Sequence, residues 1–163
     1  MTLRNGDRAA LSKPIALRAG AAMAFEVVVQ RRDGFDEEIE LGVENLPPGV
    51  SASGLKIGKG KSVGYLILSA AEDAKEAFLL AKIFGRASVK GAMVARPCPV
   101  ASMAWPVRDA KGEIPAPRLT ADVPVSVSDS EQAPLSITAA EKKVWEAKVG
   151  ETLRIPLKLT WRE

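Results

Sequence analysis

The sequence contains no histidine and a single cysteine, and these two scarcities remove several classes of chemistry. Without histidine there is no His-dependent triad, no His-ligated metal and no side chain that ordinarily titrates near neutral pH. The one cysteine, Cys98, lies between two prolines and can form neither an internal disulfide nor a cysteine-based zinc site. Because no histidine can serve as its base, we expect Cys98 to be a small packed or half-exposed residue.

Long apolar runs and charge of one sign are also missing. No stretch of about 18 apolar residues occurs, so no membrane-spanning helix is predicted. The first residues have neither an apolar core nor a small-residue cleavage site, and they are not expected to form a signal peptide. The net charge is +3, and the basic residues are scattered without interleaved aromatics. This pattern argues against nucleic acid as a partner and against direct membrane insertion.

The sequence does contain a strong alternation of apolar and polar residues. Such alternation is typical of strands with one face on a core and the other in water. It occurs over residues 23–30, 38–44, 122–128 and 153–160. Turn sequences separate these segments, at 32–34, 46–49, 58–61 and 109–112. Only 5% of residues are aromatic, so Ala, Val, Leu and Ile must fill the core. Short strands at this spacing predict an antiparallel β-sandwich.

Residues 70–84 allow two interpretations. They are rich in helix formers, and a four-turn helix would place Ala74, Phe78, Ala81 and Phe84 on one face. Alternatively, a helical turn at 71–75 would be followed by a strand over 77–84. We favour the second interpretation, because the alternating segment 63–68 needs a partner strand.

A partial internal repeat relates the two ends of the chain. Aligning Gly20 with Gly150 gives an offset of 150 − 20 = 130, and Lys13 and Arg32 then fall on identical residues. Apolar positions also coincide, since Met23, Phe25, Val27 and Val29 fall on Leu153, Ile155, Leu157 and Leu159. Such a repeat is typical of modular proteins. It predicts that the chain holds one module and the first strands of a second.

The distribution of proline suggests where one module ends. Five prolines lie within residues 96–118, and proline removes ladder donors and stiffens the chain. We therefore predict a module over 1–103, a proline-rich linker over 104–118 and a truncated second module over 119–163. The final segment, 131–163, is expected to be ordered by contact with the first module or with another copy.

Several motifs resemble one protein family. They are Gln30–Phe35 (QRRDGF), Ile39–Val50 (IELGVENLPPGV), Gly64–Ala74 (GYLILSAAEDA) and Ile83–Ala87 (IFGRA). Together they resemble the immunoglobulin-like repeat modules of large exported bacterial proteins, often found beside pre-peptidase C-terminal domains. The resemblance implies an immunoglobulin-like fold, export as part of a larger protein and neighbouring modules as partners. It says almost nothing about activity.

Five residues have structural roles in this prediction. Gly34 allows a positive φ between two strands, and Phe35 plugs the end of the sandwich. Pro47 and Gly49 suit a type II turn. Gly85 is the fifth of these structural residues. In addition, Trp105 is expected to contribute to the connection between modules.

Three clusters suggest chemistry, but each has a simpler structural explanation. Acidic residues near one turn suggest calcium, but the loop spacing of a calcium site is absent; they are Asp33, Asp36, Glu37, Glu38 and Glu40. The carboxylates of 72–76 suggest a glycosidase pair, but a capped turn explains them. The glycines and lysines of 54–64 do not follow the phosphate-loop order and lead into a strand. No metal, cofactor or catalytic residue is assigned.

Trp105, Trp145 and Trp161 are the candidate ligand-binding residues, because an indole face can stack on a sugar. The primary hypothesis is a non-catalytic spacer or adhesion module of an exported bacterial protein. The alternative is a carbohydrate- or peptide-binding module attached to an exported enzyme, with polysaccharide or a cell-surface protein as partner. An enzyme is the third hypothesis, and the missing histidine counts against it.

Overall fold

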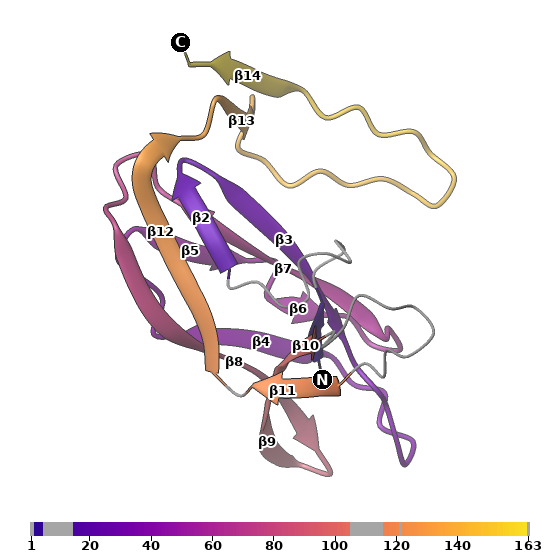
Figure 1. Cartoon of the computed structure of the whole chain (residues 1–163). Helices are drawn as coiled ribbons and strands as arrows, with labels where there is room; N and C mark the ends of the chain where they lie inside the picture. The colour runs from indigo at the N-terminus through magenta and orange to yellow at the C-terminus, as the bar shows by residue number, and fades with distance from the viewer. Residues whose placement is uncertain (1, 5–14, 105–115, 121, 163) are drawn as a thin grey trace, which may run out of the picture.

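The computed structural model describes residues 2–4, 15–104, 116–120 and 122–162, and within these ranges the chain forms strands and turns without a helix. Two six-stranded sheets pack against each other, and a separate two-stranded hairpin lies beyond them (Figure 1). The prediction of an all-β, sandwich-like fold is therefore confirmed.

The first sheet has the order β11-β10-β1-β3-β7-β5. The bounds of its strands are β11 Ala116–Thr120, β10 Val100–Ala104, β1 Thr2–Arg4, β3 Ala22–Val28, β7 Val63–Ala70 and β5 Val50–Ser53. At its centre β3 and β7 pair antiparallel, with Phe25 opposite Leu66. The pair formed by β1 and β10 is parallel.

The second sheet has the order β2-β12-β8-β4-β6, and β9 pairs with the far part of β8. The bounds of its strands are β2 Ile15–Ala19, β12 Asp122–Gln132, β8 Ala77–Val89, β4 Ile39–Glu44, β6 Lys56–Ile57 and β9 Ala92–Pro97. The pair formed by β2 and β12 is parallel. The sandwich is thus mainly antiparallel, with one parallel pair in each sheet.

The core forms where the inner faces of the two sheets meet. In β2, β7 and the middle of β8, alternate residues are buried, as the period of two requires. Val27, Leu66, Leu68 and Val125 have no exposed surface, and no polar or charged side chain is buried among the described residues. Burial of aliphatic side chains stabilises this fold at roughly 25 cal/mol for each Å² of apolar surface removed from water.

The segment that allowed two interpretations forms a turn and a strand. The amide of Ala74 donates to the Ala71 carbonyl at 3.1 Å, and β8 begins at Ala77. The preference for a strand over a four-turn helix is therefore confirmed. Partners on both sides decide the outcome, because β12 and β4 each hydrogen-bond to β8. Tertiary pairing overrides the helix propensity of the local sequence.

The predicted module boundary differs from the observed arrangement. The sequence assigned residues 119–163 to a second module, but β12 lies between β2 and β8 in the first sandwich. Val123, Val125 and Val127 are buried in its core. The first structural unit therefore extends to Gln132, because these valines need the apolar surface that β2 and β8 provide. The predicted linker lies largely outside the described residues.

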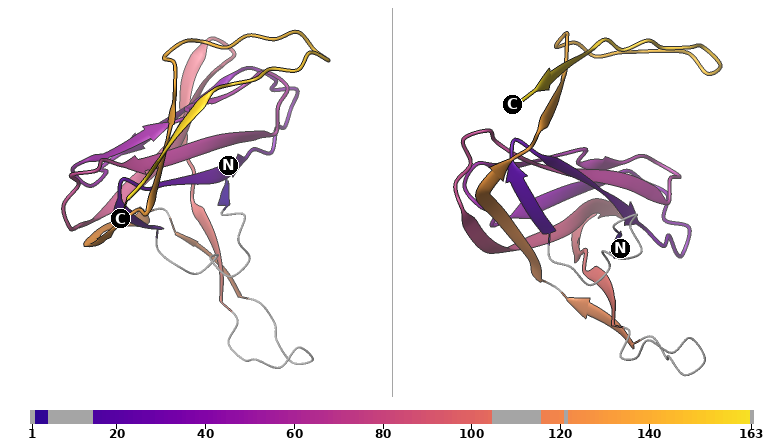
Figure 2. Two further views of the ribbon diagram at one scale, coloured as in Figure 1. Left: turned by 90° about the horizontal axis from the view of Figure 1, so that it is seen from above. Right: turned by 45° about the horizontal axis from the view of Figure 1, so that its top comes forward.

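The hairpin of β13 (Leu135–Ala139) and β14 (Leu157–Trp161) projects from one end of the sandwich (Figure 2). A long extended segment, 140–156, connects its two strands. Arg162 ties the hairpin to the sandwich through an ion pair with Glu72. Of the two contacts expected for this segment, with the first module or with another copy, the structure shows the first.

Candidate functional site

An open apolar pocket of about 280 Å³ lies where the β8–β9 hairpin extends past the sandwich core. Its walls come from the β3–β4 loop and from the hairpin. The residues that line it are Val29, Gln30, Phe35, Ile39, Gly85, Ala87, Val89, Val94 and Arg96. Apart from Gln30 and Arg96 the lining residues are apolar, so the pocket suits an apolar group.

The pocket exists because the inward-facing residues of β8 become smaller after Ile83. Ala81 and Ile83 are buried in the core, and the same face then continues with Gly85 and Ala87. These two small residues leave space that larger side chains would fill. Across the hairpin, Val94 pairs with Ala87 and supplies an apolar wall.

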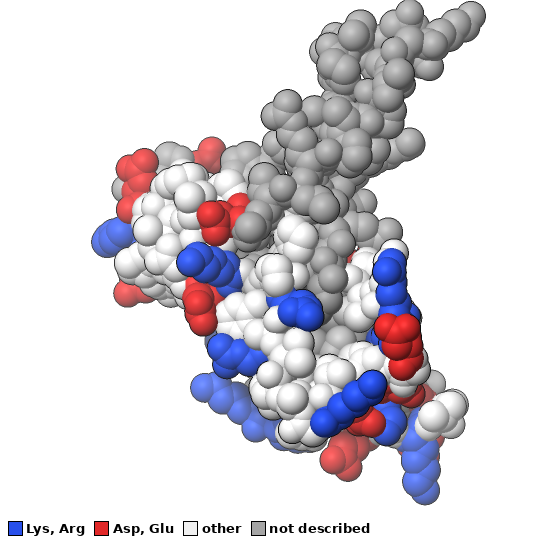
Figure 3. Space-filling model, turned by 90° about the horizontal axis from the view of Figure 1, so that it is seen from below, with Lys and Arg blue, Asp and Glu red and all other residues white. Residues whose placement is uncertain are grey.

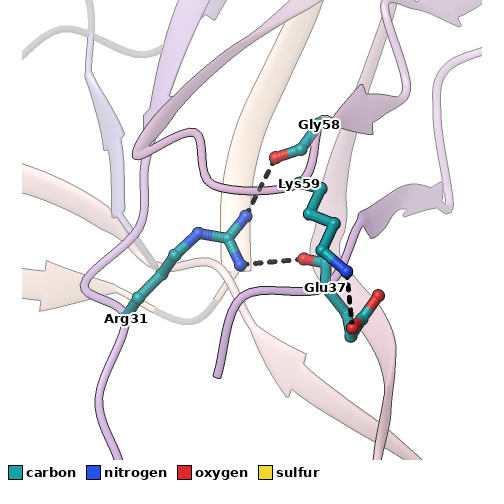
Figure 4. A network of polar contacts seen from close by, with 4 residues as sticks. All are labelled: Arg31, Glu37, Gly58 and Lys59. Atoms are coloured by element: carbon teal, nitrogen blue, oxygen red, sulfur yellow. Dashed lines mark hydrogen bonds and ion pairs between the residues drawn. The ribbon is translucent and has the colours of Figure 1, made fainter. Parts of the chain in front are cut away.

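Arg31 organises the loops beside this pocket (Figure 4). Its guanidinium group donates to three backbone carbonyls: Nε to Lys61 at 2.9 Å, Nη1 to Glu37 at 2.8 Å and Nη2 to Gly58 at 3.0 Å. The planar fork of arginine allows one side chain to satisfy three acceptors in fixed directions. Arg31 thereby joins the β3–β4 loop to the β6–β7 loop.

Phe35 completes this end of the sandwich. It is partly buried against the core, and the Arg31 guanidinium carbon lies 5.4 Å from its ring centroid. Gly34, just before it, has a φ of 74°, which glycine adopts without strain. The roles predicted for Gly34 and Phe35 match these positions. The role of Arg31 was missed; its signal was an arginine directly before a glycine turn.

Two of the acidic residues of this loop pair with lysines. Glu37 contacts Lys59 at 3.1 Å, and Glu38 contacts Lys56 at 3.0 Å. The hydrogen bond and charge of Glu38 raise the pKa of Lys56. Within the described part of the chain, no three carboxylates converge as a cation site would require. On the face in Figure 3, basic and acidic side chains are interspersed.

The other two candidate clusters also have structural partners. Glu72 forms an ion pair with Arg162, on the turn that precedes β8. Gly58 and Gly60 belong to a turn in which the Lys61 amide donates to the Gly58 carbonyl at 3.1 Å. That turn leads into β7, whereas a phosphate loop would open a helix.

Cys98 is fully buried. Its amide donates to the Ile83 carbonyl at 2.7 Å, so it continues the pairing of the β8–β9 hairpin toward the core. Burial raises the pKa of its thiol to about 11. The thiolate, which is the nucleophilic form, is therefore scarce at neutral pH.

Two of the three candidate tryptophans, Trp145 and Trp161, lie in the described part of the chain. Trp161 is 74% exposed on β14, where it pairs with Leu135. Trp145 is partly exposed, and the Lys143 ammonium lies 3.9 Å from its ring centroid. Trp105 lies outside the described residues. Of the two described tryptophans, Trp161 has the more accessible indole face for a ligand.

Gly49, Pro47 and Gly85 lie in one turn and one strand of the sandwich. Gly49 has a φ of 78°, and the Val50 amide donates to the Pro47 carbonyl at 3.0 Å, which closes the turn. Pro47 is fully buried. Gly85 lies in β8 opposite Leu41 of β4 and lines the pocket.

The fold and pocket define an all-β, sandwich-like protein. Comparisons with family models, curated proteins and solved structures found no match to this chain. Within the described residues there is no helix long and apolar enough to cross a membrane.

Proposed function

We propose that this chain is a non-catalytic, immunoglobulin-like module that acts as a spacer or adhesion unit in a larger exported bacterial protein. The observation that carries the proposal is the content of the core. Among the described residues no polar or charged side chain is buried. Enzymes generally hold reactive groups in perturbed, partly buried surroundings, and the described interior offers only the thiol of Cys98.

The resemblance in the loop and turn motifs supports the immunoglobulin-like part of this proposal. Those motifs coincide with turns that hold the sandwich together, at Gly34 and at Pro47–Gly49. Arg31 adds a rigid link between two loops at one end. A stiff end without reactive groups suits a unit that transmits position along a modular protein.

Two measurements test the proposal. The full chain should show no turnover on panels of esters, glycosides and peptides, and turnover lost on replacing one carboxylate would overturn the non-catalytic assignment. Antibodies against the chain should label intact cells of the organism that makes it, or cells with only the outer envelope opened. Labelling that requires complete lysis would overturn the assignment to an exported protein.

A second candidate function is ligand binding by a module of an exported enzyme. The exposed indole of Trp161 and the 280 Å³ apolar pocket favour it. Titration with polysaccharides and peptides, followed by tryptophan fluorescence, separates the two functions. Saturable quenching that Trp161→Ala abolishes would indicate a sugar-stacking site. Saturation blocked by Ala87→Phe, which fills the pocket, would indicate a peptide site.

A further inference from the structure

The turn at Gly150 has the same geometry as the turn at Gly20. In the turn at Gly20, the Ala21 amide donates to the Arg18 carbonyl at 2.9 Å. In the turn at Gly150, the Glu151 amide donates to the Lys148 carbonyl at 3.0 Å. Donors and acceptors are each 130 residues apart, which is the offset of the sequence repeat. The two glycines have φ values of 76° and 91°.

The residues that follow these two turns have very different surroundings, since β3 begins at Ala22 in the first unit whereas β14 begins only at Leu157. In the first unit Phe25 and Val27 of β3 are 3% and 0% exposed. Their counterparts 130 residues later, Ile155 and Leu157, are 47% and 56% exposed. The counterpart residues therefore have the pattern of a core strand and lack most of the cover that β3 has.

One edge of β14 is already paired and the other is not. The Pro156 carbonyl accepts from the Ala140 amide at 3.1 Å, and the Arg162 amide donates to the Pro134 carbonyl at 3.0 Å. Even-numbered residues thus point their backbone groups toward β13. Because backbone groups alternate along a strand, Leu157 and Leu159 point theirs to the opposite edge. Among the described residues, no strand pairs with that edge.

The first unit shows what occupies the equivalent edge. There the odd-numbered Val29 donates to the Ser62 carbonyl at 2.8 Å, and Ala21 accepts from the Ala70 amide at 2.9 Å, so β7 covers that edge. Pro156 lies directly before β14, and its backbone faces β13. The free edge therefore keeps its amide donors. Proline at an edge normally blocks pairing, and here it does not.

The charge of this segment narrows the chemistry of the occupant. Arg154 and Lys158 are exposed and lie four residues apart, so they would share one face if the added segment extended β14 back to residue 154. The other residues of that series, 152, 156 and 160, carry no acidic group. An added strand with acidic residues opposite these two cations would gain from cross-strand ion pairs.

We infer that the free edge of β14, together with residues 152–156 that lead into it, is a binding site for an extended segment in which aliphatic and acidic side chains alternate. The segment adds as an antiparallel strand in the position that β7 holds beside β3. Main-chain hydrogen bonds supply affinity, and an aliphatic side chain of the segment covers Ile155. This goes beyond the proposed function, since a spacer or adhesion role does not require an open strand edge.

The register of β3 and β7 specifies a probe. Val28 pairs with Val63, and Ala24 pairs with Ile67. At the 130-residue offset, Lys158 is the counterpart of Val28 and Arg154 is the counterpart of Ala24. The probe is therefore a synthetic peptide of residues 62–71 carrying Val63→Glu and Ile67→Glu. A control peptide carries Val63→Lys and Ile67→Lys at the same positions, so the two differ only in charge.

Hydrogen exchange of the full chain measures the result residue by residue. The acidic peptide should slow exchange of the Leu157 and Leu159 amides about tenfold, while the amides of Lys158 and Thr160, which face β13, change little. The acidic peptide should bind roughly fivefold tighter than the basic one. Lys158→Glu, an exposed substitution that leaves the fold intact, should reduce or reverse that preference.

Three results would overturn the inference. One is no binding of either peptide. Another is equal binding of both peptides with no effect of Lys158→Glu. The third is protection of Leu157 and Leu159 that rises with the concentration of the chain alone, because a second copy would then be the occupant. None of these results bears on the non-catalytic proposal, which the turnover panel tests separately.

Discussion

The guanidinium group of Arg162 lies directly against the backbone of Gly20, 142 residues earlier in the chain. A Cβ added at residue 20 would lie 2.9 Å from Nη1 and 3.1 Å from Nη2 of Arg162. Arg162 also donates to the Ala133 carbonyl at 3.3 Å and pairs with Glu72. This one side chain therefore connects the C-terminal hairpin to the first turn and to the turn before β8.

Gly20→Ala should destabilise the sandwich by about 1–2 kcal/mol, because residue 20 has a φ of 76°. The added methyl group should also displace Arg162 and speed hydrogen exchange in β13 and β14. Urea unfolding measures the first effect. In an Arg162→Ala background, Gly20→Ala should cause no further change in hairpin exchange, since the two residues act on one contact. Additive effects on the hairpin would contradict the contact.

Arg31→Ala should lower the free energy of unfolding by about 1–3 kcal/mol, because three carbonyls lose a charged donor. Arg31→Lys should recover less than half of the loss, since an ammonium group cannot reproduce the fork. Chemical denaturation checks both values. The control is Arg32→Ala, whose side chain donates to Gln30 on the surface at 3.3 Å. An equal loss in the control would contradict the role of Arg31.

Gly54→Ala should be more destabilising than Gly91→Ala, although both residues have positive φ values, 73° and 82°. A Cβ at residue 54 would lie 2.5 Å from the Tyr65 carbonyl oxygen, whereas nothing lies within 4 Å of a Cβ at residue 91. Backbone cannot move aside as a flexible side chain can. We expect Gly54→Ala to cost at least about 1 kcal/mol more than its matched control. Equal melting temperatures would contradict this packing.

Cys98 should make the protein less stable in alkaline solution. Its pKa is about 11 when folded, against a usual value of 9.0. Between these values the unfolded chain releases the thiol proton and the folded chain retains it, so stability falls as pH rises from about 9 to about 11. The loss should approach roughly 2–3 kcal/mol.

The measurement compares unfolding at pH 8 and pH 10.5 for the natural chain and for Cys98→Ala. Lysine and tyrosine titrations affect both proteins alike, so the difference isolates the thiol. Cys98→Ala should be less stable at pH 8, because a cavity replaces the sulfur. It should also show a weaker pH dependence. The same slope in both proteins would show that Cys98 is not shielded from water.

Much of the strand pattern could be predicted because it follows from local alternation. The predicted segments 23–30 and 38–44 overlap β3 and β4 to within one or two residues at each end, since a period of two in apolar residues is typical of a strand. The positive φ values at Gly34 and Gly49 were likewise implied by local turn chemistry.

The sheet partners could not be predicted in the same way. The spacing of the valines in β12 predicts a strand with a buried face. It does not predict that β2 and β8 are the neighbours of this strand. The pocket is equally hidden in the sequence. Its space arises because Gly85 and Ala87 lie opposite Arg96 and Val94, and that pairing exists only once the hairpin has formed.

The amino-acid sequence by itself determined which segments form strands and which residues form turns. It also determined which kinds of chemistry are excluded because the required side chains are missing. Those properties depend on each residue and its near neighbours. Only the tertiary structure decided that β12 completes the first sandwich, that Arg31 joins two loops and that, among the described strands, none pairs with the second edge of β14. These outcomes depend on contacts between distant segments, and burial of their shared apolar surface selects among many compatible pairings.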